Sequence, residues 1–151
     1  METDGIRKQV LADHVALRRT LGRLEGLANR VLAGRESHFR ALRGEAIGLL
    51  DALLVHIEWE DVYLAPALRD IGARGEQLAS KLTREHVEQR ELLRHILRGL
   101  SDMTRPGRVV AQNLVDLFGL LREDMVGEEE MLLDVRVLRR HTAFRSDADI
   151  C

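Results

Sequence analysis

Apolar residues recur every three or four positions through four long segments of this chain, with only short turn signals between them. Gly34, Gly72 and the pair Pro106-Gly107 stand at the three breaks. This spacing places the apolar side chains of a segment on one face of an α-helix. Glycine often ends a helix, and proline is favoured where one starts. The pattern predicts helices over about residues 6–33, 38–71, 76–103 and 109–140.

The short connections decide how these helices can be arranged. Neighbouring helices joined by a few residues must run antiparallel. We therefore expect an all-α protein, an up-down-up-down antiparallel four-helix bundle over residues 1–145. Residues 146–151 are predicted to be a polar tail, because Ser146, Asp147 and Asp149 interrupt any apolar face there.

Composition excludes several classes of protein. The 151 residues carry 23 basic and 25 acidic side chains, so no basic surface predicts a nucleic-acid or membrane partner. The sequence has no apolar stretch of membrane-spanning length and no secretory signal, which predicts a cytoplasmic protein. The single cysteine, Cys151, excludes a disulfide framework and a thiolate metal site. The sequence leaves the oligomeric state and any protein partner open.

Several candidate metal ligands are predicted to lie at one height in the bundle. His56 and Glu60 are one helical turn apart and can reach the same point. His14 and His56 lie about 21 residues to either side of the first turn, near Arg35, and equal distances from a turn mean equal height. Glu60 and His86 lie about 13 residues from the second turn in the same way.

The fourth helix brings a carboxylate to the same height. His86 precedes Pro106 by about 20 residues, and Glu129 follows it by about 23. Buried charges at one level require pairing or a metal ion. Imidazole and carboxylate ligands suit iron, manganese or zinc. The sequence therefore predicts a metal site built from ligands on all four helices: His14, His56, Glu60, His86 and Glu129.

These residues resemble the hemerythrin-like family, the HHE cation-binding domains. The segment from His56 to Leu68, HIEWEDVYLAPAL, is similar to the family's second helix, and the Asp13-His14 and Glu85-His86 pairs also fit. The resemblance implies that His14 and His56 bind one iron, that Glu60 and Glu129 bridge two irons, and that His86 serves the second. It also implies binding of a small ligand such as dioxygen, peroxide or nitric oxide.

The chain departs from the family pattern at two positions. Met125 stands where the family has a histidine on the fourth helix, and Arg90 lies one turn after His86, where some relatives have a second histidine. A thioether is a poor iron ligand beside carboxylates, and a guanidinium stays protonated. One or two irons are therefore both open. In the one-iron alternative, Arg90 replaces the second cation and pairs with Glu129 or Glu60.

Two hypotheses about function follow. The first is a hemerythrin-like non-haem iron protein that acts as a carrier, store or sensor of iron or of a small diatomic ligand. The alternative is a metal-free helical interaction or regulatory module, in which the polar interior is a relic site. Whether the protein is an enzyme stays open.

Overall fold

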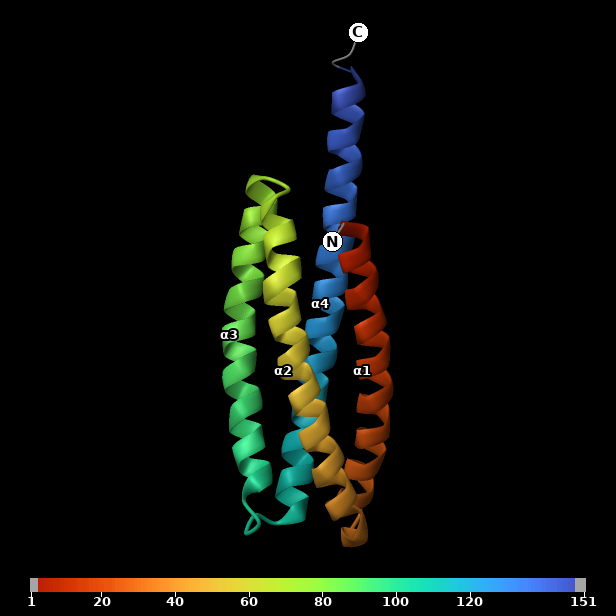
Figure 1. Ribbon diagram of the computed structural model, residues 1–151. Coiled ribbons are helices and arrows are strands. Elements are labelled where there is room, and N and C mark those ends of the chain that lie inside the picture. Colours follow the sequence, from red (N-terminus) through yellow and green to blue (C-terminus); the bar gives the residue numbers. More distant parts are fainter. Residues whose placement is uncertain (1–2, 149–151) are drawn as a thin grey trace.

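The computed structural model describes the backbone of residues 3–148 and the side chains of residues 3–134. The described residues form four α-helices and no strand: α1 (Thr3–Leu32), α2 (Phe39–Arg69), α3 (Ala73–Ser101) and α4 (Gly107–Ala148), with a short 3-10 turn η1 (Glu36–His38) before α2. The helices run alternately in opposite directions along one bundle axis (Figure 1). The predicted all-α up-down-up-down bundle is confirmed.

Helix α4 is longer than its sequence pattern indicated. The apolar periodicity ended near Arg140, whereas the helix continues to Ala148 and extends past the ends of the other three helices (Figure 1). Residues 146–148 of the predicted polar tail are therefore helical, and residues 149–151 lie outside the described residues. No helix in the described part of the chain combines the length and apolar character needed to cross a membrane.

The turn after α1 needs a glycine. Gly34 has a φ of 92°, in the left-handed region that glycine adopts without steric cost. Its N–H donates to the carbonyl of Val31 at 3.0 Å, and the N–H of Arg35 donates to the carbonyl of Arg30 at 2.9 Å. These two bonds form a Schellman motif, which closes the helix and satisfies carbonyls that would otherwise lack donors. The chain can therefore reverse within a few residues.

The α2–α3 turn is equally tight. Gly72 has a φ of 115°, and its carbonyl accepts the first hydrogen bond of α3, from the N–H of Glu76 at 2.9 Å. A Cβ atom on Gly75 would lie 1.9 Å from the carbonyl oxygen of Leu68, so only glycine permits this approach. The two turns fix the relative heights of α1, α2 and α3.

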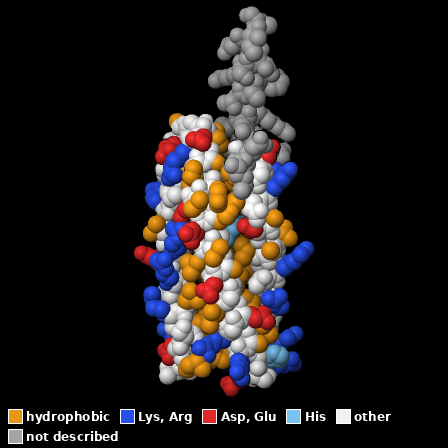
Figure 2. Space-filling model, viewed as in Figure 1, with side chains coloured by type: hydrophobic (Ala, Val, Ile, Leu, Met, Phe, Trp, Pro, Cys, Tyr) orange, Lys and Arg blue, Asp and Glu red, His pale blue; other side chains and the backbone are white. Residues whose placement is uncertain are grey.

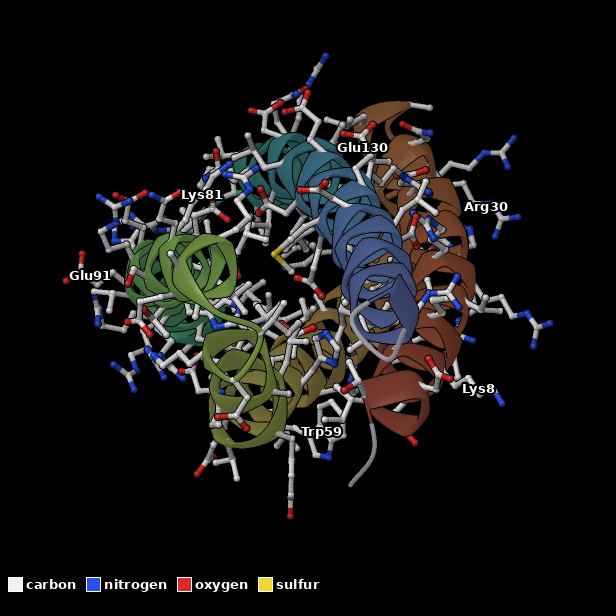
Figure 3. All side chains as sticks on the ribbon, turned by 90° about the horizontal axis from the view of Figure 1, so that it is seen from above. Lys8, Arg30, Trp59, Lys81, Glu91 and Glu130 are labelled. Atoms are coloured by element: carbon white, nitrogen blue, oxygen red, sulfur yellow. The ribbon has the colours of Figure 1, made fainter. Side chains whose placement is uncertain are left out.

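The apolar core is divided into two clusters along the bundle. The larger cluster includes Leu24, Leu50 and Phe118, and the smaller one includes Val10 and Leu68. On the face shown in Figure 2, charged side chains lie along both edges, with apolar side chains between them. Seen along the bundle, the labelled lysine, arginine and glutamate side chains point away from the interior (Figure 3). Along each helix, the residues between the two clusters include a histidine or a glutamate, so the bundle carries a polar layer across its interior.

Candidate metal centre

The polar layer contains every buried polar or charged residue among those described. His14, Glu60 and His86 are each 1% exposed. His56 and Glu128 adjoin them, with side chains 10% and 12% exposed. The layer therefore draws on all four helices, as the positions counted from the turns predicted.

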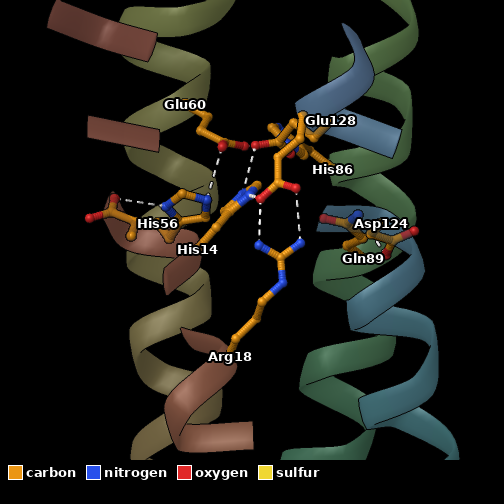
Figure 4. A network of polar contacts seen from close by, with 10 residues as sticks. His14, Arg18, His56, Glu60, His86, Gln89, Asp124 and Glu128 are labelled. Carbon is orange, nitrogen blue, oxygen red and sulfur yellow. Dashed lines mark hydrogen bonds and ion pairs between the residues drawn. The ribbon is translucent and has the colours of Figure 1, made fainter. Parts of the chain in front are cut away.

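One nitrogen of each imidazole faces an inner carboxylate (Figure 4). His56 Nε2 lies 2.9 Å from Glu60 Oε1, and His86 Nε2 lies 3.1 Å from Glu60 Oε2. His14 Nε2 lies 3.1 Å from Glu128 Oε1. Glu60 thus offers one oxygen to each of two histidines, which is the arrangement expected of a bridging carboxylate.

The other nitrogen of each imidazole faces an outer carboxylate. The Nδ1 atoms of His14, His56 and His86 lie 3.1 Å, 3.1 Å and 2.6 Å from oxygens of Glu129, Asp13 and Asp61, respectively. Ionised carboxylates can only accept hydrogen bonds, so each Nδ1 carries the proton. In the neutral imidazole, each Nε2 then has a free lone pair directed into the layer, as a metal ligand requires.

The inner carboxylates fit a cation. Ligand atoms of His14, His56, Glu60 and Glu128 all lie within 4.8 Å of one another. Both oxygens of Glu60 and Oε1 of Glu128 are buried and lack a hydrogen bond of acceptable angle. Their contacts with Nε2 atoms are ion pairs, because charge attraction depends on distance more than on angle.

The spacing of these four ligand atoms is close to what a metal ion requires. Iron-type ions bond nitrogen and oxygen ligands at about 2.0–2.2 Å, which places opposite ligand atoms about 4 Å apart. The four ligand atoms are already near that spacing. The donor set of two imidazoles and two carboxylates suits iron, manganese or zinc.

Comparison with known families agrees with this geometry. The model of the hemerythrin HHE cation-binding domain matches residues 6–135. This chain belongs to the hemerythrin HHE family. No curated protein and no solved structure matches it.

In this hemerythrin-like layer, the metal-free protein holds protons where a cation would bind. Burial acts to lower the pKa of His56, but its contact with Glu60, supported by Glu128 and Asp13, raises it to about 9. The pKa of His14 and of His86 is raised as well, because neighbouring carboxylates outweigh burial. At neutral pH the His56 imidazole is therefore protonated, and the raised pKa of His14 and of His86 favours the charged form of these rings too.

The two inner carboxyl groups differ in proton affinity. Burial and the neighbouring carboxylate of Glu60 raise the pKa of Glu128 to about 7. Burial acts in the same direction on Glu60, but Glu128, His56 and His86 together hold its pKa well below the usual range. Glu60 is therefore the permanent anion of the layer, and Glu128 is the carboxyl group that can carry a proton near neutral pH.

A cavity of about 30 Å³ adjoins the layer on the side of the larger apolar cluster. His14, His56, Glu60 and Glu128 border it on one side. Its remaining lining is mostly apolar and includes Met125, whose side chain is buried. A cavity of this size holds one or two water-sized molecules.

The structure brings together most of the residues predicted from the sequence. His14, His56 and Glu60 lie in the four-residue cluster, and His86 contacts Glu60 from α3. Glu129 lies outside that cluster: it contacts the Nδ1 side of His14, and the neighbouring Glu128 takes the inner position.

Asp13, Asp61 and Glu128 had not been identified as site residues from the sequence, and Arg90 has a different partner from the one predicted. Arg90 pairs with Asp61, rather than with Glu129 or Glu60. Asp13 and Asp61 directly adjoin His14 and Glu60 in the chain. An acidic residue next to a candidate ligand is the sequence signal that could have identified them. Glu128 had no distinguishing signal within a run of three glutamates.

Proposed function

We propose that this protein is an iron-binding member of the hemerythrin HHE family that carries or senses a small diatomic ligand. The observation that supports the proposal most strongly is Glu60. Its carboxylate is 1% exposed, faces imidazoles on both sides, and has no hydrogen bond of acceptable angle to either oxygen. A buried carboxylate is costly unless positive charge lies beside it, and the two facing imidazoles mark the places from which that charge, or a metal ion, can act.

The proposed ligands of the first iron are His14, His56, Glu60 and Glu128. The sequence had favoured Glu129 for the fourth helix, but Glu129 is engaged by Arg18 and by the Nδ1 side of His14. Glu128 directs an oxygen toward the lone-pair side of the same imidazole. We therefore assign the inner position to Glu128.

A second iron would have fewer ligands. His86 and the second oxygen of Glu60 face each other, and Asp124 lies one turn before Glu128 and borders the same cavity (Figure 4). Asp124 accepts a hydrogen bond from Gln89 at 2.9 Å. The proposal therefore expects one strongly held iron and a second that binds more weakly.

The cavity beside the cluster supports the choice of ligand. Bound iron would supply affinity for dioxygen or nitric oxide, and the leucine, isoleucine and methionine side chains that line most of the rest of the cavity leave a small, largely apolar space beside it. A small, largely apolar space suits an uncharged diatomic molecule.

The test is metal content by elemental mass spectrometry on untagged protein loaded with ferrous iron without oxygen. Wild type is expected to retain about one iron or more per chain. Glu60→Gln keeps the shape but removes the charge, so it should lose most of that iron. Glu58→Gln is the matched control, because Glu58 lies on the same helix but is exposed.

A change in the absorption spectrum on adding dioxygen or nitric oxide would support the ligand part of the proposal. Wild type that retains no iron would refute the proposal. It would favour the metal-free interaction module. One observation supports that alternative: both ring nitrogens of His14, His56 and His86 lie within ion-pair distance of a carboxylate.

A further inference from the structure

Arg18 lies one turn after His14 on α1 and reaches the fourth helix. Its guanidinium forms a two-point ion pair with Glu129, with Nη1–Oε1 and Nη2–Oε2 distances of 2.5 Å and 3.0 Å. The same Oε1 atom lies 3.1 Å from His14 Nδ1. Guanidinium, carboxylate and imidazole therefore form one continuous chain, which ends at the His14 nitrogen facing Glu128 (Figure 4).

This chain fixes both the direction and the tautomer of the His14 ring. A two-point guanidinium–carboxylate pair holds the carboxylate plane as well as its position. The carboxylate can only accept, so it keeps the proton on Nδ1 and leaves the Nε2 lone pair for the inner side. His14 is 1% exposed, whereas the side chains of Arg18 and Glu129 are 33% and 27% exposed. Two partly exposed side chains, Arg18 and Glu129, thus orient a buried imidazole.

The same contact separates the roles of three consecutive glutamates. Glu128, Glu129 and Glu130 have the same chemistry, and Glu130 is exposed. Because Arg18 holds Glu129 against the outer nitrogen, Glu128 is the glutamate left to face the inner nitrogen. The rotation of α4 points the two carboxylates in different directions, and Arg18 holds Glu129 in its outer position.

The arrangement occurs a second time at His86. Arg90 pairs with Asp61, and Asp61 lies 2.6 Å from His86 Nδ1. These residues come from α2 and α3, whereas the first chain joins α1 and α4. Two independent helix pairs thus place an arginine behind the carboxylate that orients a buried imidazole.

We propose that Arg18 and Glu129 are positioning residues for His14: they hold its Nε2 toward the metal and keep Glu129 out of the coordination shell. The proposal rests on the proposed metal binding. It predicts that a surface arginine controls the affinity of a buried site through two intervening contacts.

The chain supplies a matched control for its test. Arg122 and Glu25 form another two-point pair between α4 and α1, at 2.9 Å and 3.1 Å, with side chains 37% and 34% exposed. Neither residue contacts a histidine among the described contacts. Arg122→Met removes an interhelical ion pair of the same type, so it measures what such a pair contributes to the fold alone.

Cobalt(II) titration followed by visible absorption gives the affinity. Arg18→Met and Glu129→Gln should each weaken cobalt binding about 10- to 100-fold, the usual effect of removing a partner that orients a ligand. The double variant should bind cobalt as tightly as the single variant with the lower affinity, because both changes act on the same ring. Arg18→Lys, which keeps the charge but loses the two-point geometry, should lie between. Arg122→Met should stay within about twofold of wild type.

A second readout reports the ring itself. In zinc-loaded protein, the Nδ1 proton of His14 should give a protected imidazole signal by ¹⁵N–¹H NMR, and this signal should exchange rapidly with water in Arg18→Met but not in Arg122→Met. Equal cobalt affinity of Arg18→Met and wild type, or an equal loss in Arg122→Met, would overturn the inference while leaving metal binding intact. Failure of wild type to bind cobalt would overturn the proposed function itself.

Discussion

Raising the pH of the metal-free protein from about 6 to about 9 should destabilise it through His56. The pKa of this imidazole is about 9 in the folded protein and 6.5 as the ordinary value. A group whose pKa is raised on folding contributes stability that is complete below the unfolded pKa and is lost as the pH rises through the folded pKa. The window for His56 therefore runs from about pH 6.5 to about pH 9.

The size of the effect follows from that difference. Each tenfold change in proton affinity corresponds to about 1.4 kcal/mol, so the His56 contribution is about 3 kcal/mol. The side chain is 10% exposed, so solvent screens it little. His14 and His86 also have a raised pKa and change stability in the same direction. The pKa of Glu128 is raised from 4.5 to about 7, so this carboxyl group adds a further loss of stability as the pH rises between these two values.

Urea denaturation followed by circular dichroism, with a chelator present, measures this loss across the pH range. His56→Gln should flatten the pH dependence, whereas His95→Gln should leave it unchanged, since His95 is exposed on α3. Bound metal should reverse the trend, because a ligand nitrogen must lose its proton and metal affinity therefore rises with pH. A free energy of unfolding that stays constant from about pH 6.5 to 9 would show that the Glu60–His56 ion pair does not hold the layer together.

Three further predictions test the site and the fold. Asp124→His should raise the iron content measured by elemental analysis, because it places an imidazole one turn before Glu128. Met125→His should leave the iron content unchanged if Glu128, and not Glu129, is the inner ligand. Phe118→Ala should lower the free energy of unfolding by about 3–5 kcal/mol in urea, since Phe118 is fully buried; a loss under about 1 kcal/mol would contradict its place in the core. Gly75→Ala should lower the free energy of unfolding by about 1–3 kcal/mol or more in the same assay, because the added Cβ would collide with the carbonyl of Leu68. Gly48→Ala should raise it by up to about 1 kcal/mol, because its Cβ would meet nothing within 4 Å and alanine favours the helix.

Much of the fold could be predicted because its signals are local. Gly34 and Gly72 mark turns that require a positive φ, and the apolar spacing between them marks the helices. The helix ends shifted only slightly, from Ile6 to Thr3 at the start of α1. The end of α4 was placed too early, because the apolar pattern stops near Arg140 while the helical backbone continues to Ala148.

The height of the candidate site could be predicted, but not every residue in it. Counting from the turns placed His14, His56 and Glu60 at one level, and the structure brings these three together. The same count cannot separate Glu128 from Glu129. Adjacent helical residues differ by about 1.5 Å in height but by about 100° in direction, and the direction decides which carboxylate faces inward.

The sequence by itself determined four helices, their antiparallel order and the level at which histidines and glutamates meet, because periodicity, turn residues and segment lengths are properties of the chain alone. The tertiary structure decided how each helix is rotated about its axis. That rotation depends on the packing of all four helices at once. It placed Glu128 against His14 Nε2, Glu129 between Arg18 and the opposite ring nitrogen, and Arg90 on Asp61.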